Sequence, residues 1–86
     1  MMQHELFPKE VTSNVPMITL TGSELLHIEQ HMGLLACHEE EIAFRTSCGQ
    51  LTVTGEGLYF CRYTSEEAVI AGTINGVCLA QEGRRR

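Results

Sequence analysis

Three histidines and one cysteine lie close together in this sequence, and residues of these types can bind a metal ion. They are His27, His31, Cys37 and His38. Imidazole nitrogen and thiolate sulfur are common zinc ligands, but the spacing of these four residues matches no known zinc motif. His27 and His31 would share one face of a helix, whereas a strand would hold them about 13 Å apart. A small metal-binding or redox protein is therefore one hypothesis, and it requires a helix at this point.

Other arrangements that could support catalysis are incomplete. A nucleophilic cysteine needs a base within reach, and Cys37 and His38 are neighbours whose side chains would point to opposite faces of a strand. Gly55-Glu56-Gly57 lacks the third glycine and the following helix of a nucleotide-binding loop, so we interpret it as a turn. The sequence thus predicts no catalytic residue, no cofactor and no small-molecule substrate, and we expect that the protein is not an enzyme.

Two tyrosines are the candidate partner-binding residues. Tyr59, Cys61 and Tyr63 alternate with Leu58 and Phe60. If Leu58 and Phe60 face the core of a sheet, the other stripe is either covered by a second sheet or exposed as an aromatic patch that suits a protein partner. Both alternatives follow from the same pattern, so the sequence leaves them open.

The charge of the chain excludes one class of partner. The net charge is -5, from 11 acidic and 6 basic residues. Three of the basic residues are Arg84, Arg85 and Arg86, so the rest of the chain carries 3 minus 11, or -8. Such a body repels phosphate backbones, and we expect no nucleic-acid binding. Three terminal arginines could add a weak attraction to an anionic membrane surface, but a solubilising tail is the simpler interpretation.

Length and segment composition predict one cytoplasmic domain. A chain of 86 residues buries a modest core, so self-association is expected to add stability. The start, MMQHELFPKE, lacks the features of a signal peptide, and no apolar run reaches the length of a membrane span. In that compartment the four cysteines are expected to be reduced thiols.

The elements that must position these residues are short strands. Alternating apolar residues and glycine-bearing turns predict about eight, mostly antiparallel, in an all-β sandwich, small barrel or rolled meander. Glu39 to Glu41 mark a solvated turn, and the stretch that follows is interpreted as two successive hairpins. One buried sheet face is expected to carry Ile42, Phe44, Leu51, Val53, Leu58 and Phe60. The expected strands are 17–21, 24–30, 34–37, 41–46, 50–54, 58–63 and 67–71, with 34–37 buried on both faces, and one further strand.

The course of that last strand has two alternatives. Asn75-Gly76 is a strong hairpin signal, which would pair residues 69–71 with 77–79. Alternatively the chain bends at Gly72 and continues to Leu79 as an edge strand. Around this domain, 17–80, we expect an extended or partly disordered arm at 1–16 and a polar basic tail at 81–86.

The chain resembles a known family over residues 7 to 80. Its segments FPKEV at 7–11 and VPMITLTG at 15–22 are similar to the opening and first strand of the YabP/YqfC family of sporulation proteins from endospore-forming Gram-positive bacteria. Met17, Gln30, Met32 and Cys37 depart from it, standing where the family tends to have Arg, Asn, Lys and an aromatic residue. The ordered set continues with Leu26, Ile28, Glu29, His31, Gly33, Leu34, Glu41, Ile42, Thr46, Gly49, Val53, Gly55, Leu58, Glu66, Glu67, Gly72 and Ile74.

The resemblance implies a function that the residues alone do not. It implies a non-enzymatic assembly or adaptor module that acts in endospore formation in the mother-cell cytoplasm, at or near a membrane. Its implied partner is a membrane-associated sporulation protein of the YqfD type. The family spacing also lacks the Asn-Gly turn, which favours the bend at Gly72.

Overall fold

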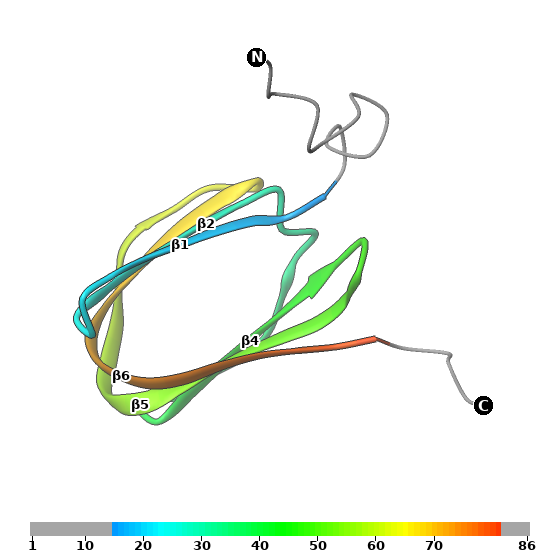
Figure 1. Ribbon diagram of the computed structural model, residues 1–86. Coiled ribbons are helices and arrows are strands. Elements are labelled where there is room, and N and C mark those ends of the chain that lie inside the picture. Colours follow the sequence, from blue (N-terminus) through cyan, green and yellow to red (C-terminus); the bar gives the residue numbers. More distant parts are fainter. Residues whose placement is uncertain (1–14, 82–86) are drawn as a thin grey trace, which may run out of the picture.

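One antiparallel sheet makes up the part of the chain that the computed structural model describes, residues 15–81. Its strand order is β1-β2-β6-β5-β4-β3 (Figure 1). No helix occurs within these residues, and hence none that could cross a membrane. Most of the predicted arm and tail lie outside the described residues. The strands are β1 (Met17–Thr21), β2 (Leu25–Glu29), β3 (Leu34–Cys37), β4 (Glu41–Thr46), β5 (Gly49–Tyr63) and β6 (Glu67–Ala80).

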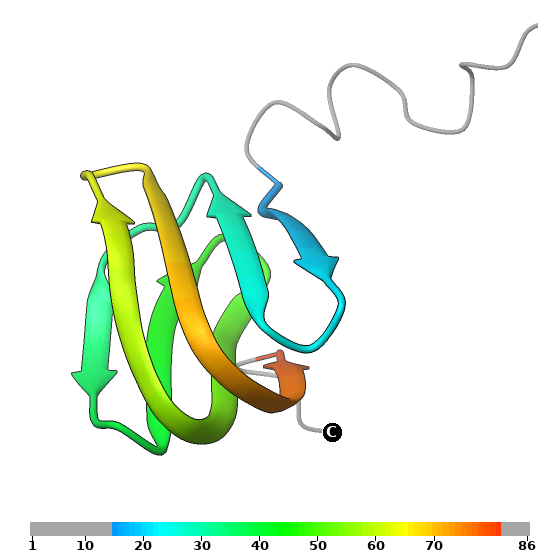
Figure 2. The same cartoon turned by 90° about the vertical axis from the view of Figure 1, so that its left-hand side faces the viewer.

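The sheet folds over on itself because its two longest strands bend. β4 pairs with the first half of β5, and β2 pairs with the first half of β6. The bends therefore place β1, β2, the start of β6 and the end of β5 in one layer, called here the β1–β2 layer (Figures 1 and 2). The β3–β4 layer consists of β3, β4, the start of β5 and the end of β6. The all-β prediction is confirmed, in its rolled form.

Glycines set the position of both bends. Gly72 has φ +127°, and a Cβ on it would lie 2.6 Å from the carbonyl oxygen of Gly57. Gly57 itself has φ +61°, and the β5–β6 register shifts between Thr54 and Gly55 and again across Gly57, between Glu56 and Tyr59. These residues adopt a left-handed backbone that L side chains rarely reach, so a bulged bend forms where the ladder would otherwise run straight.

These bends correct the predicted strand count to six. Gly55-Glu56-Gly57 is not a hairpin turn but the bend within β5, so the second predicted hairpin is wrong. The bend at Gly72 is confirmed, and the hairpin at Asn75-Gly76 is wrong, because β6 runs through it. The first hairpin, from β4 to β5 through Ser47 and Cys48, is confirmed.

The core lies between the two layers. Ile42, Phe44, Leu51 and Val53 are fully buried, Leu58 is nearly so, and Phe60 packs against the cluster. The predicted buried face is therefore confirmed. The β1–β2 layer adds Leu26, Ile28, Ala68 and Ile70 to this core, and Ile74, just after the bend of β6, completes it.

One strand is more exposed than its sequence suggests. Residues 34–37 were expected to be buried on both faces, but Leu34, Leu35 and Cys37 are exposed because β3 is the last strand of the sheet. The turn after it carries the exposed Glu39 and Glu40, as predicted. Their carbonyl oxygens accept hydrogen bonds from the amides of Leu58 and Gly55 at the bend of β5.

Candidate functional site

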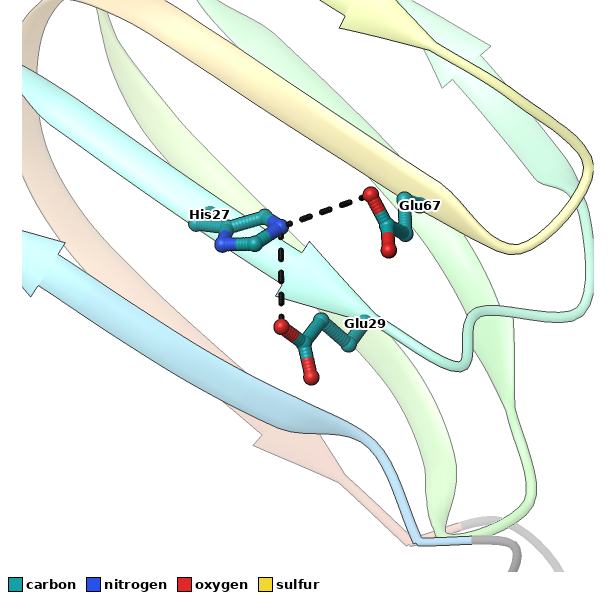
Figure 3. A group of neighbouring side chains, drawn as sticks. All are labelled: His27, Glu29 and Glu67. Carbon is teal, nitrogen blue, oxygen red and sulfur yellow. Dashed lines mark ion pairs between the residues drawn. The ribbon is translucent and has the colours of Figure 1, made fainter.

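A histidine and two glutamates meet on the outer surface of the β1–β2 layer. His27 Nε2 lies 3.7 Å from an oxygen of Glu29 and 3.7 Å from an oxygen of Glu67. Figure 3 shows the imidazole with one carboxylate from its own strand, β2, and one from the neighbouring strand, β6. These three are the group of metal-ligating side chains that the described residues bring within 4.8 Å of one another.

Strand geometry brings these three side chains together. His27 and Glu29 are two apart on β2 and so project from the same face, while Glu29 lies directly opposite Glu67 in the β2–β6 ladder. Beyond this pair, the amides of Gln30 and His31 both donate to the carbonyl oxygen of Glu66. The ladder and these two bonds together fix the backbone around the group.

Only one member of this group was predicted as a ligand from the sequence. His27 was a candidate ligand, but it was grouped with His31, Cys37 and His38 instead of with the two glutamates. Glu29 and Glu67 are 38 positions apart, and only the β2–β6 register brings them together. The available signal was the position of Glu29 two residues after His27 in a predicted strand.

His31 is buried, and no other residue of 15–81 forms a metal-ligating group with it. Its Nε2 donates to the carbonyl oxygen of Thr64 at 2.9 Å, and its Nδ1 accepts from the amide of Gly33 at 3.0 Å. Both ring nitrogens are thus occupied in the neutral imidazole. The ring packs between Phe44, at 5.1 Å between centroids, and Tyr63, at 5.2 Å.

The predicted set of His27, His31, Cys37 and His38 is not brought together in the described residues. The segment that was required to be helical is β2 and a turn, so the four side chains do not converge. Cys37 and His38 are exposed at the end of β3 and in the turn that follows. All four cysteines are free, at positions 37, 48, 61 and 78.

Tyr59 and Tyr63 are exposed, by 59% and 45%, but do not form one stripe. The β5–β6 register shifts between Phe60 and Arg62, so Tyr63 lies opposite the buried Ala68 and Tyr59 opposite Ala71. The extra residue at this bulge reverses the alternation, and the two tyrosines project from opposite faces of the sheet. The shared parity expected from the sequence is therefore wrong.

The two tyrosines instead lie at the two ends of a strand segment that has a free edge. Residues 59–63, called here the β5 edge segment, pair with β6 on one side only, because β4 pairs with β5 no further than Thr54. At one end of it, Leu58 is bonded to the β3–β4 turn. At the other end, the carbonyl oxygen of Thr64 accepts the bond from His31. Within residues 15–81, no strand pairs with the other side of the segment between these two contacts, so this edge can accept a further strand.

Comparison with known proteins gives one family. A model of the YabP family matches residues 12–86. A protein of Bacillus subtilis (strain 168) described as "Uncharacterized protein YqfC" is 33% identical over 70 residues, which are 81% of this chain and 75% of the relative. No solved structure matches the chain.

Proposed function

The chain belongs to the YabP family, and we propose that it acts as a non-enzymatic assembly module in endospore formation. The resemblance to a sporulation family supports the process, and the β5 edge segment supports the mode of action. The proposed partner is a membrane-associated sporulation protein of the YqfD type, bound from the mother-cell cytoplasm. Self-association through the same edge is part of the proposal.

The observation that carries this proposal is a free strand edge with an exposed tyrosine on each side of the sheet. An unpaired edge offers N–H and C=O groups to a strand from a partner, as in other complexes formed by strand addition. Tyr59 would contact that strand on the outer face and Tyr63 on the inner face. Tyrosine supplies a large contact area at low entropic cost and is enriched among the residues that dominate binding energies.

Charge in the same segment favours a particular kind of partner strand. Arg62 is exposed between the two tyrosines and forms no ion pair with another residue of 15–81. The protein as a whole carries a net charge of -5, so Arg62 is a positive group on an acidic molecule. A partner strand with apolar residues and one carboxylate would complement it.

Replacement of Tyr59 by serine tests the proposal, because the exposed ring can be removed without opening the core. We expect Tyr59→Ser to keep the wild-type fold but to lower the number of heat-resistant spores, in a strain whose own copy of the gene is deleted. The matched control is Met32→Ser, since Met32 is also 59% exposed but lies outside the β5 edge segment. This control should sporulate like wild type.

Two results would contradict the proposal at different points. If the deletion strain itself forms normal numbers of spores, the chain has no required role in sporulation. If the deletion blocks sporulation but folded Tyr59→Ser restores it fully, the β5 edge segment is not the binding surface. Circular dichroism of the purified variants establishes that they are folded.

A further inference from the structure

We propose that His27, Glu29 and Glu67 bind one divalent transition-metal ion, for which Zn²⁺ is the probe. The two distances of 3.7 Å from Nε2 to the carboxylate oxygens are too long for hydrogen bonds. Zinc bonds of about 2.1 Å in a tetrahedral site place ligand atoms about 3.4 Å apart. Both distances from Nε2 are therefore close to the separation that an ion between the ligand atoms requires, and all three ligand atoms lie within 4.8 Å of one another.

The donor set selects the class of ion. One imidazole nitrogen and two carboxylate oxygens suit Zn²⁺ and its first-row neighbours, whereas Mg²⁺ and Ca²⁺ favour oxygen donors alone. Two carboxylates and a neutral imidazole carry a charge of -2, which one divalent ion neutralises. Three protein ligands leave a further position of the ion to water.

The charges of the site favour an ion as well. Like charges directly opposite each other in neighbouring strands are destabilising, and Glu29 and Glu67 occupy such a pair. Within residues 15–81, the ion pairs of these two carboxylates are with His27 alone. Arg62 lies on the same face, opposite Val69, but forms no ion pair with either of them. A cation between the carboxylates would remove the repulsion that the strand register imposes.

The backbone that carries the ligands is already ordered. β2 is paired on both sides, by β1 and β6, and the start of β6 is paired by β2 and β5. Glu67 also closes the β5–β6 turn, where its amide donates to the hydroxyl of Thr64 at 2.9 Å. The side chains of His27 and Glu29 are 37% and 40% exposed, so an ion can enter from solvent. Binding then requires only side-chain rotations.

Calorimetric titration of the full chain with Zn²⁺, in the presence of a reductant that does not bind metals, tests the site. We expect one ion per chain, with affinity at least about ten-fold lower in His27→Ala and in Glu67→Gln, because loss of even an outer-shell partner costs about 10- to 100-fold. The matched controls are His38→Ala and Glu56→Gln, which remove an exposed histidine and an exposed glutamate elsewhere. Both controls should bind like wild type.

Thermal unfolding provides a second test, because Glu67→Gln should change the Tm in opposite directions with and without zinc. Zinc at 100 times its Kd should raise the Tm of the wild type by about 10 °C or more. Glu67→Gln should lose this rise, yet should have a Tm a few degrees higher than wild type without metal, because one of the two opposed charges is gone.

Cobalt distinguishes this site from binding by the four thiols. Co²⁺ bound by nitrogen and oxygen lacks the intense near-ultraviolet band that thiolate ligands produce, and we expect no such band. The proposal is overturned if the wild type does not bind zinc, if the band appears, or if His27→Ala and Glu67→Gln bind as tightly as the two controls.

Discussion

At the scale of the single residue, the contacts of His31 hold three segments of the chain together. Its ring bonds to Thr64 in the β5–β6 turn and to Gly33 before β3, while its backbone amide donates to Glu66. The ring also contacts Phe44 on β4. A histidine with both nitrogens bonded to backbone groups is a structural residue, because it has no free lone pair for a metal or a proton transfer.

Replacement of this histidine should therefore affect stability. We expect His31→Ala to lower the free energy of unfolding by about 2–4 kcal/mol, since it leaves a cavity and two backbone groups without their partner. His38→Ala, on the exposed turn, should change it by less than about 0.5 kcal/mol. Urea denaturation measures both, and equal effects would show that the buried contacts of His31 contribute nothing.

Phe44 should be among the most costly core residues to truncate. It is fully buried and contacts the rings of both His31 and Phe60, with centroids 5.1 Å and 6.1 Å away. We expect Phe44→Ala to cost about 3–5 kcal/mol, enough to unfold much of so small a domain. Thr52→Ala, on the other face of the same sheet, should be mild. If both shifted the urea midpoint equally, the assigned faces would be wrong.

Gln30 offers a stabilising substitution. Its φ is +70°, the one positive value among the described non-glycine residues. Asparagine tolerates this left-handed conformation better than glutamine. We expect Gln30→Asn to raise the free energy of unfolding by about 0.5 kcal/mol, measured by urea denaturation. A loss of stability would show that a contact of the glutamine side chain stabilises the protein by more than the relief of backbone strain.

At the scale of the element, the length of β5 and β6 decides the fold. β4 pairs only with the first half of β5 and β2 only with the first half of β6, while β5 and β6 pair with each other along both halves, so each belongs to both layers. The amide of Ile74 donates to the carbonyl oxygen of Ser23, which ties the β1–β2 turn to β6 just after its bend. The bend of β6 is thus bonded to the β1–β2 turn, and the bend of β5 is bonded to the β3–β4 turn.

Gly72 should tolerate no side chain, because its backbone is left-handed and a Cβ would collide with the backbone of Gly57. We expect Gly72→Ala to cost about 3 kcal/mol or more, measured by thermal unfolding. Gly57→Ala is the matched control: Gly57 also has positive φ, but nothing lies within 4 Å of its Cβ position. It should cost only about 1 kcal/mol. The reverse order would contradict the proposed bend.

Local pattern predicted most of the strands but mistook the bend within β5 for a turn between two strands. Residues 17–21, 34–37 and 41–46 were predicted with the bounds that the structure has, because alternation and turn residues are local signals. Gly55 and Gly57 misled because the same residues suit a hairpin turn and a bulged bend. Which of them forms depends on whether β6 pairs with β5 on both sides of the glycines. Local sequence does not show this pairing, because the paired residues are far apart in the chain.

The candidate sites depended even more on distant contacts. The bulge between Phe60 and Arg62 moved Tyr63 to the inner face, and no residue type in that segment announces it. The pairing of Glu29 with Glu67 likewise follows from the register of two strands that are far apart in sequence. The burial of His31 follows from packing between the layers, since its local sequence resembles an ordinary turn.

At the scale of the whole molecule, the two layers share one core. Leu26 and Ile70 from the β1–β2 layer and Leu51 and Val53 from the β3–β4 layer belong to a single buried cluster. The layers are joined through β5 and β6, so neither can open without exposing the apolar side chains of the other. We therefore expect one cooperative unfolding transition in spite of the layered shape.

The placement of the tyrosines makes this cooperativity measurable. The chain has 2 tyrosines and no tryptophan, and both tyrosines lie at the end of β5, in the β1–β2 layer. Tyrosine fluorescence therefore reports on that layer, whereas circular dichroism reports on all strands. Leu51→Ala, in the β3–β4 layer, should lower stability by about 2–4 kcal/mol and shift the urea midpoint equally by both probes. A midpoint that moves by circular dichroism but not by tyrosine fluorescence would mean that the layers unfold separately, and that the bends in β5 and β6 act as hinges between two independent units.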